Sequence, residues 1–166
     1  MSYGEVLGVK SNGNIVGLGE IGSDCELKIL EYLTIKYDLG ELKIPKISEQ
    51  RNQLLDFSKK DNFERKDKIL LYFTLNYMLV RKNNLDKLIT TLKTLNHYKT
   101  IRNLIDILNN DIKFKYNKEK IKYFCWNPTS VVDFWWQFAR VENNSGGLKA
   151  NIYEVEDKIW FLFDEL

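Results

Sequence analysis

The chain has 166 residues, a formal net charge of +2, 44% apolar residues and 13% aromatic residues. This length can bury a sizeable core, so we expect residues 1–166 to form a single domain. The longest apolar run, residues 69–80, is too short to cross a bilayer, and no apolar signal segment opens the sequence. The composition therefore predicts a cytoplasmic protein without membrane contact.

Charge is distributed unevenly along the chain. Residues 1–42 carry three Lys or Arg and seven Asp or Glu, and residues 123–166 carry the same numbers. Residues 43–122 carry nineteen basic and nine acidic side chains. Two acidic ends flank a basic middle, and a basic segment of this kind favours contact with phosphates or with acidic protein surfaces.

The first segment is predicted to be a β-hairpin. Asn12-Gly13 is a strong signal for a two-residue type I′ turn, because both residue types tolerate a positive φ. Pairing outward from this turn gives three cross-strand pairs, Val9–Val16, Leu7–Leu18 and Glu5–Glu20. Gly8, Gly17 and Gly19 then share the other face, which indicates that a helix or another backbone approaches there.

The return arm of this hairpin contains Gly17-Leu18-Gly19-Glu20-Ile21-Gly22, which matches the G-x-G-x-x-G of dinucleotide-binding loops. Such a loop follows a long buried parallel strand, and Glu20 would repel a pyrophosphate. We interpret the glycines as a junction between hairpin and helix and expect no cofactor. Ser23 and Glu26 form a capping box for the next helix, which we expect to end at Gly40.

Helical periodicity dominates the middle of the chain. Ser48 is a candidate cap for a helix that reaches residue 57, and residues 64–82 are predicted to form a longer apolar helix. Apolar residues at helical spacing predict two further helices, over 85–95 and 101–108, joined around residues 96–98 as an αα-hairpin.

The last third is predicted to return to strands. Residues 112–116 and 120–124 alternate around a turn and suggest a second hairpin, and residues 131–138 a short helix. Residues 148–163 end in a strand that is apolar on both faces, which needs paired neighbours, and the N-terminal hairpin offers them. We therefore expect an α+β fold, with an antiparallel sheet from the N- and C-terminal hairpins (1–42 and 111–166) and a helical insert (43–110).

The second hairpin carries the main candidate binding surface. Its members are basic or aromatic, together with one tryptophan from the following helix: Lys113, Lys115, Lys118, Lys120, Lys122, Phe114, Tyr116, Tyr123 and Trp136. Ammonium groups interleaved with rings could follow a phosphate backbone and stack on bases. Lysines also protect edge hairpins from aggregation, and aromatic stripes usually form core, so both structural interpretations stay open.

Other candidate sites are sparse. Glu5 opposite Glu20 places two carboxylates together, which suits a cation or acid–base chemistry unless Lys or Arg from elsewhere covers them. Cys25 and Cys125 are interpreted as reduced, buried thiols, and His97 as a turn residue. No catalytic triad, metal-ligand spacing or P-loop is present in the sequence, so we expect a protein that is not an enzyme and binds no metal.

The N-terminal residues also carry a resemblance. Tyr3-Gly4-Glu5-Val6-Leu7, the turn Asn12-Gly13-Asn14 and the following Gly19-Glu20 resemble the start of small uncharacterised phage and prophage proteins, which begin with a YGxVxxVxxDGN hairpin. The likeness covers about forty residues, and Asn12 replaces the turn Asp of that pattern. The resemblance implies an accessory protein of a mobile element and transfers no catalytic residue.

Three functional hypotheses follow. The first is a non-enzymatic binding protein that inhibits a host defence system, as anti-CRISPR proteins do, by occluding a protein or ribonucleoprotein partner. The second is a toxin-neutralising immunity protein, which would work by the same occlusion. The third is charge-driven binding of RNA or DNA through residues 43–122, where the basic excess lies.

Overall fold

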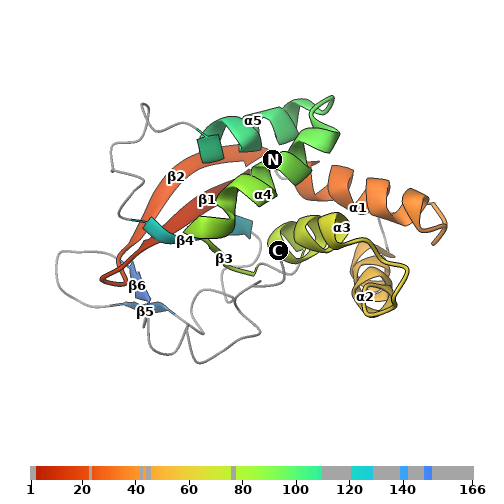
Figure 1. Cartoon of the computed structure of the whole chain (residues 1–166), viewed down its shortest axis with the longest axis horizontal. Coiled ribbons are helices and arrows are strands. Elements are labelled where there is room, and N and C mark those ends of the chain that lie inside the picture. Colours follow the sequence, from red (N-terminus) through yellow and green to blue (C-terminus); the bar gives the residue numbers. More distant parts are fainter. Residues whose placement is uncertain are drawn as a thin grey trace.

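The computed structural model describes residues 3–22, 24–41, 43, 46–75, 78–109, 121–128, 139–141 and 148–150. These residues form a four-stranded antiparallel sheet with helices packed against it, and a separate two-stranded sheet (Figure 1). Strands come from the N- and C-terminal parts of the chain and helices from the middle, so the predicted α+β fold is confirmed.

The N-terminal hairpin forms as expected, but its turn differs. Strands β1 (Tyr3–Lys10) and β2 (Ile15–Gly22) are joined by residues 11–14. The Lys10 amide donates to the Asn14 carbonyl at 2.8 Å, which leaves a loop of three residues, 11–13, inside this pair. The Gly13 amide donates to the Lys10 carbonyl, and only Gly13 of the loop has a positive φ, 91°. The loop is therefore a three-residue connection with a left-handed glycine, and the predicted type I′ turn is wrong.

The longer loop shifts the pairing near the turn by one residue. Val9 pairs with Ile15 and Leu7 with Gly17, so two of the three predicted pairs are wrong. A bulge at Leu18 restores the predicted register, and Glu5 does lie opposite Glu20. The bulge also separates the glycines, because Gly17 pairs with Leu7 on one face and Gly19 with Val6 on the other.

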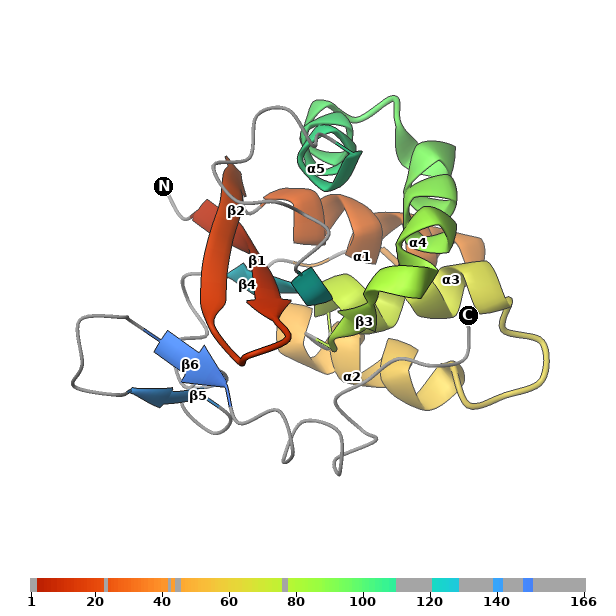
Figure 2. The same cartoon turned by 60° about the vertical axis from the view of Figure 1, so that its left-hand side comes forward.

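The predicted close approach at the glycines is confirmed at Gly19. A Cβ on Gly19 would lie 2.8 Å from the Ile107 side chain of α5 (Lys99–Asn109), which runs along β2 (Figure 2). The G-x-G-x-x-G segment is thus the return arm of a hairpin under a helix and belongs to no βαβ unit in the described residues.

Strand β1 lies inside the four-stranded sheet, whose order is β2-β1-β4-β3. Its second neighbour is β4 (Ile121–Pro128), which also pairs with the short β3 (Val80–Arg81) at Tyr123 and Phe124. Strand β4 is therefore an interior strand with neighbours on both sides at these residues. The predicted hairpin with residues 112–116 is wrong at Tyr123 and Phe124, because β1 and β3 occupy both sides of β4 there. Residues 112–116 themselves lie outside the described residues.

Both faces of the central strands are buried. Val6, Phe124 and Trp126 on one face join the helices in a single apolar core. Val9 and Tyr123, which pair with each other on the opposite face, are also fully buried. Apolar residues on both faces are what a central strand with cover on each side requires.

The helices follow the predicted order with three corrections. Helix α2 (Ile47–Phe57) begins after Lys46 and has no side-chain cap, so the predicted cap Ser48 lies inside the helix. Helix α1 (Asp24–Lys36) ends because Asp38 adopts a left-handed φ of 55°, with the Leu39 amide donating to the Thr34 carbonyl. The predicted stop at Gly40 is two residues late. The capping partner Ser23 lies outside the described residues.

The predicted 64–82 helix is much shorter in the structure. After α2 (Ile47–Phe57), helix α3 (Arg65–Leu70) continues as a π-helical turn (Leu71–Leu75), and the chain is already extended at β3. Pairing with β4 requires this, since the backbone of Val80 and Arg81 supplies ladder hydrogen bonds that a helix would satisfy internally.

Helices α4 (Leu85–Leu92) and α5 form the predicted αα-hairpin, with short 3₁₀ turns before and after α4. Their apolar residues are buried at helical spacing, as the pattern predicted: Leu85, Leu88, Ile89, Leu92, Leu95, Ile101, Leu104, Ile105 and Leu108.

The C-terminal strands are only partly described. Strands β5 (Ala139–Val141) and β6 (Leu148–Ala150) pair with each other in a two-stranded sheet. Residues 148–150 were expected in one sheet with the N-terminal hairpin. In the structure β6 contacts β2 but belongs to the separate sheet, and β1 pairs with β4 instead. Residues 131–138 and 159–163 lie outside the described residues.

Cys25 and Cys125 are both free and buried, as predicted. Burial raises both thiol pKa values, which keeps these groups protonated and unreactive. Within the described parts of the chain, no helix has the length and apolar character needed to span a bilayer.

Candidate functional site

Most of the predicted binding surface lies outside the described residues. This holds for Lys113, Lys115, Lys118, Lys120, Phe114, Tyr116 and Trp136. Lys122 and Tyr123 are described, and both lie on β4. Tyr123 is fully buried, with Arg81 and Lys122 at 5.6 and 5.5 Å from its ring centre. A buried ring cannot stack on a base, so Tyr123 does not belong to an exposed binding surface.

The predicted carboxylate pair is present in the structure, with its two residues on neighbouring strands β1 and β2. Glu5 lies opposite Glu20, and burial together with the negative charge of Glu20 raises the pKa of Glu5. Gly17 leaves room for the Glu5 carboxylate, since a Cβ there would lie 2.1 Å from Glu5 Oε1. No third acidic, histidine or cysteine ligand completes a metal site among the described residues.

A half-buried carboxylate that the sequence did not reveal is Glu26. Its Oε1 accepts a hydrogen bond from Trp126 Nε1 at 2.5 Å, which joins α1 to β4. Burial raises the pKa of Glu26 to about 7, against the opposing effects of this hydrogen bond and of the Arg51 charge. Sequence analysis assigned Glu26 to a helix cap, because nothing in the pattern links it to a residue 100 positions away.

A second unpredicted cluster joins the end of α1 to the start of α3. Lys36 Nζ lies 2.7 Å from Asp67 Oδ2 and 3.3 Å from Glu64 Oε1. The Tyr37 hydroxyl donates to the same Asp67 oxygen, and burial together with this hydrogen bond raises the pKa of Tyr37 to about 12. Asp67 is 1% exposed, so this cluster is a structural clamp closed to substrates.

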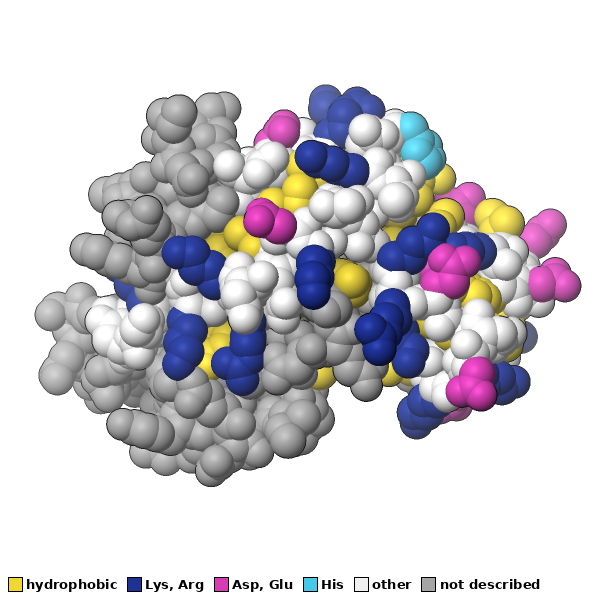
Figure 3. All heavy atoms as spheres, viewed as in Figure 1, with side chains coloured by type: hydrophobic (Ala, Val, Ile, Leu, Met, Phe, Trp, Pro, Cys, Tyr) yellow, Lys and Arg dark blue, Asp and Glu magenta, His cyan; other side chains and the backbone are white. Residues whose placement is uncertain are grey.

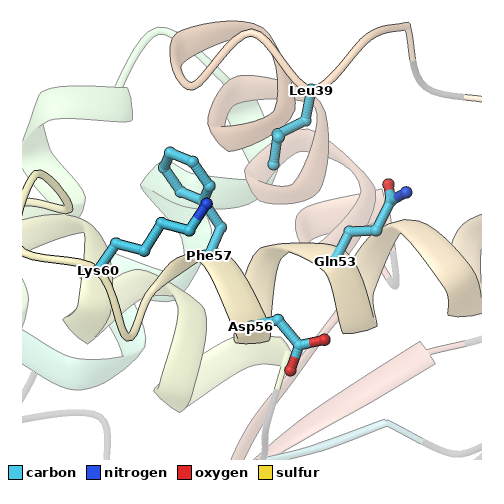
Figure 4. Close-up of a pocket in the computed structure, with 5 residues that line it drawn as sticks. All are labelled: Leu39, Gln53, Asp56, Phe57 and Lys60. Carbon is cyan, nitrogen blue, oxygen red and sulfur yellow. The ribbon is translucent and has the colours of Figure 1, made fainter.

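A shallow pocket with a volume of about 290 Å³ lies at the end of α2 (Figure 4). Its lining residues are Leu39, Gln53, Asp56, Phe57 and Lys60. The Lys60 ammonium lies 4.9 Å from the Phe57 ring centre, while the Asp56 side chain points away from both (Figure 4). The polar groups do not converge on one point, which is what orients a small ligand in a pocket.

The most distinctive exposed surface is on the αα-hairpin. Residues 78–109 contain six basic and two acidic side chains. Five of the basic residues are exposed, and together they define the hairpin face: Lys82, Lys87, Lys93, Lys99 and Arg102. Figure 3 shows Lys and Arg side chains spread across α4 and α5 on this side of the molecule.

Much of this charge is not neutralised locally. Around α1–α3, Lys36, Lys59 and Lys66 form ion pairs with Asp or Glu, while Lys60 forms none with a described residue. By contrast, neither Lys93 nor Lys99 forms an ion pair with any residue that the structure describes. The hairpin face therefore keeps a positive potential that an anionic partner can satisfy.

The face contains few apolar groups. Among the described residues, Ile35 on α1 is the only large hydrophobic side chain that is exposed, at 67%. Interfaces that form by burying apolar patches need a larger continuous area. Burial of a large apolar patch is therefore not the way in which a partner of the hairpin face is held.

Comparisons of the chain with protein-family models, with curated proteins and with solved structures found no match.

Proposed function

We propose that this protein is a non-enzymatic binding protein that docks on an anionic macromolecular surface and occludes it. The observation that carries the proposal is the hairpin face, whose exposed lysines at 93 and 99 have no acidic partner in the described structure. Two helices packed on a sheet hold this face rigidly, so little conformational entropy is lost when a partner binds.

The proposed partner is a protein or a ribonucleoprotein. An acidic protein surface and a nucleic acid on a protein both supply negative charge, and charge complementarity accelerates association. The more specific role, inhibition of a host defence system, is supported only by the resemblance of the N-terminal residues to phage and prophage proteins. A toxin-neutralising immunity protein would use the same mode of binding.

Capture from a lysate of the source cells tests the proposal. The tagged protein should retain a stoichiometric partner, and the Lys93→Glu/Lys99→Glu variant should lose it. The matched control is Lys59→Glu/Lys60→Glu, which makes the same change in net charge on the exposed residues after α2. Partner loss in both variants, or turnover of a nucleotide by the purified protein, would contradict an occluding binder that uses the hairpin face.

A further inference from the structure

The connection between α4 and α5 brings cations and rings together. The His97 and Tyr98 rings lie in contact, with centroids 4.0 Å apart and planes inclined by 42°. Lys28 reaches across from α1 and places its ammonium 5.3 Å from the centre of the Tyr98 ring. Arg102 donates from Nη1 to the carbonyls of Asn96 and His97, at 3.0 and 3.1 Å.

These contacts, together with the exposed Lys93 and Lys99 on either side of the connection, define a junction surface. It consists of Lys28, Lys93, His97, Tyr98, Lys99 and Arg102. His97 is exposed and Tyr98 is half-buried, so the rings form a ledge rather than a part of the core. Lys93, Lys99 and Arg102 are exposed around this ledge. Arg102 is held in place by its two carbonyl partners, which fixes one cation beside the backbone of Asn96 and His97.

We propose that the junction surface binds single-stranded nucleic acid. This inference rests on the proposed function and names the chemistry of the anionic partner. Proteins that bind single strands combine cations that follow the phosphates with rings on which bases stack. The junction surface supplies both, with His97 over Tyr98 as the stacking ledge and Lys93, Lys99 and Arg102 as phosphate contacts.

The combination favours a single strand over a duplex. Bases in a duplex are already stacked on each other, so a duplex would use the cations but not the rings. Stacking does not depend on base identity or on the sugar, so we expect little sequence preference and similar binding of RNA and DNA. Asp24 lies close to the start of α5, because a Cβ at Gly22 would lie 2.9 Å from the Asp24 carboxylate and 3.9 Å from the Thr100 side chain. The negative charge of Asp24 limits the positive surface on that side.

Fluorescence anisotropy with labelled 15-nucleotide oligo(U) and oligo(dT), and with a 15-base-pair duplex, tests the proposal. Three phosphate contacts on a single strand predict that affinity falls about 20-fold between 50 and 200 mM salt. Lys93→Glu/Lys99→Glu should weaken binding at 50 mM salt at least about tenfold, whereas Lys59→Glu/Lys60→Glu should change it less than about threefold. Equal losses in the two variants would show net charge alone and would overturn the proposal.

The contribution of stacking on the His97 ring is tested separately. His97→Ala should weaken binding of both oligonucleotides by about tenfold, and His97→Phe should keep it within about threefold, because the loss is one of stacking. Position 97 is exposed, and circular dichroism of each variant checks that it folds. Absence of oligonucleotide binding at 50 mM salt, or duplex binding as tight as single-strand binding, would overturn the inference. Partner capture that survives either result would leave the proposed occluding function intact.

Discussion

Trp126 Nε1 donates a hydrogen bond to Glu26 Oε1 at 2.5 Å, so a carboxylate of α1 is held against the fully buried indole of β4. This contact joins the first helix to the interior of the sheet. Gly4 on β1 makes room for the Trp126 side chain, because the indole ring lies where any Cβ at position 4 would be. The two residues give the fold both a titratable contact and a tightly packed one, and each can be tested.

The titratable contact predicts that stability falls as pH rises. The pKa of Glu26 is raised from its usual 4.5 to about 7 by burial, so the folded state binds a proton more tightly than the unfolded state. Between these pH values the unfolding free energy should decrease with pH, by about 3 kcal/mol in all. Glu26→Gln, which stays neutral, should lose this contribution to the slope, keep that of Glu5, and be the more stable protein at pH 8.

Urea denaturation followed by circular dichroism, at pH values from 4 to 8, measures this effect. Glu49→Gln, an exposed change on α2, is the control and should keep the slope of the unmodified protein. An unchanged slope in Glu26→Gln would show that Glu26 is not the group responsible.

The packed contact predicts a large effect of a single methyl group. A Cβ at position 4 would lie 2.0 Å from one atom of the buried Trp126 ring, so Gly4→Ala should lower the unfolding free energy by about 3 kcal/mol. Gly17→Ala is the matched control, since its Cβ would meet only the movable Glu5 carboxylate, and it should cost about 1 kcal/mol or less. Similar losses in the two variants would contradict the packing of Trp126 on Gly4.

The Lys36–Asp67 clamp predicts a contrast between buried and exposed ion pairs. Asp67 is 1% exposed and binds both Lys36 and Tyr37, so Asp67→Ala should lower the unfolding free energy by about 1–3 kcal/mol through the loss of these two partners. Lys59→Ala breaks an exposed 3.9 Å pair with Asp56 and should cost less than about 0.5 kcal/mol. Urea denaturation of both variants measures the difference, and a small effect of Asp67→Ala would show that the clamp does not stabilise the fold.

The end of α1 predicts a stabilising substitution. Asp38 is exposed and has a φ of 55°, a conformation that favours glycine. Asp38→Gly should therefore raise the unfolding free energy by about 0.5–1 kcal/mol. Gly40→Ala, at a φ of 97°, is the converse change and should destabilise. A thermal melt of each variant decides, and a lower melting temperature for Asp38→Gly would show that another contact holds Asp38 in place.

What the sequence by itself determined is local. The Asn12-Gly13 turn located the first hairpin, and apolar spacing located α4 and α5, because these patterns act through neighbouring residues of one element. The basic excess of the middle segment was also visible in the sequence, although not where its side chains would gather.

Only the tertiary structure decided the rest. The strand register depends on loop length and on a bulge at Leu18, and the end of α3 depends on the pairing of β3 with β4. The hydrogen bond between Trp126 and Glu26 and the approach of Lys28 to Tyr98 each join residues at least 70 positions apart. No local pattern records such contacts, because their free energy is gained only when separate elements pack together.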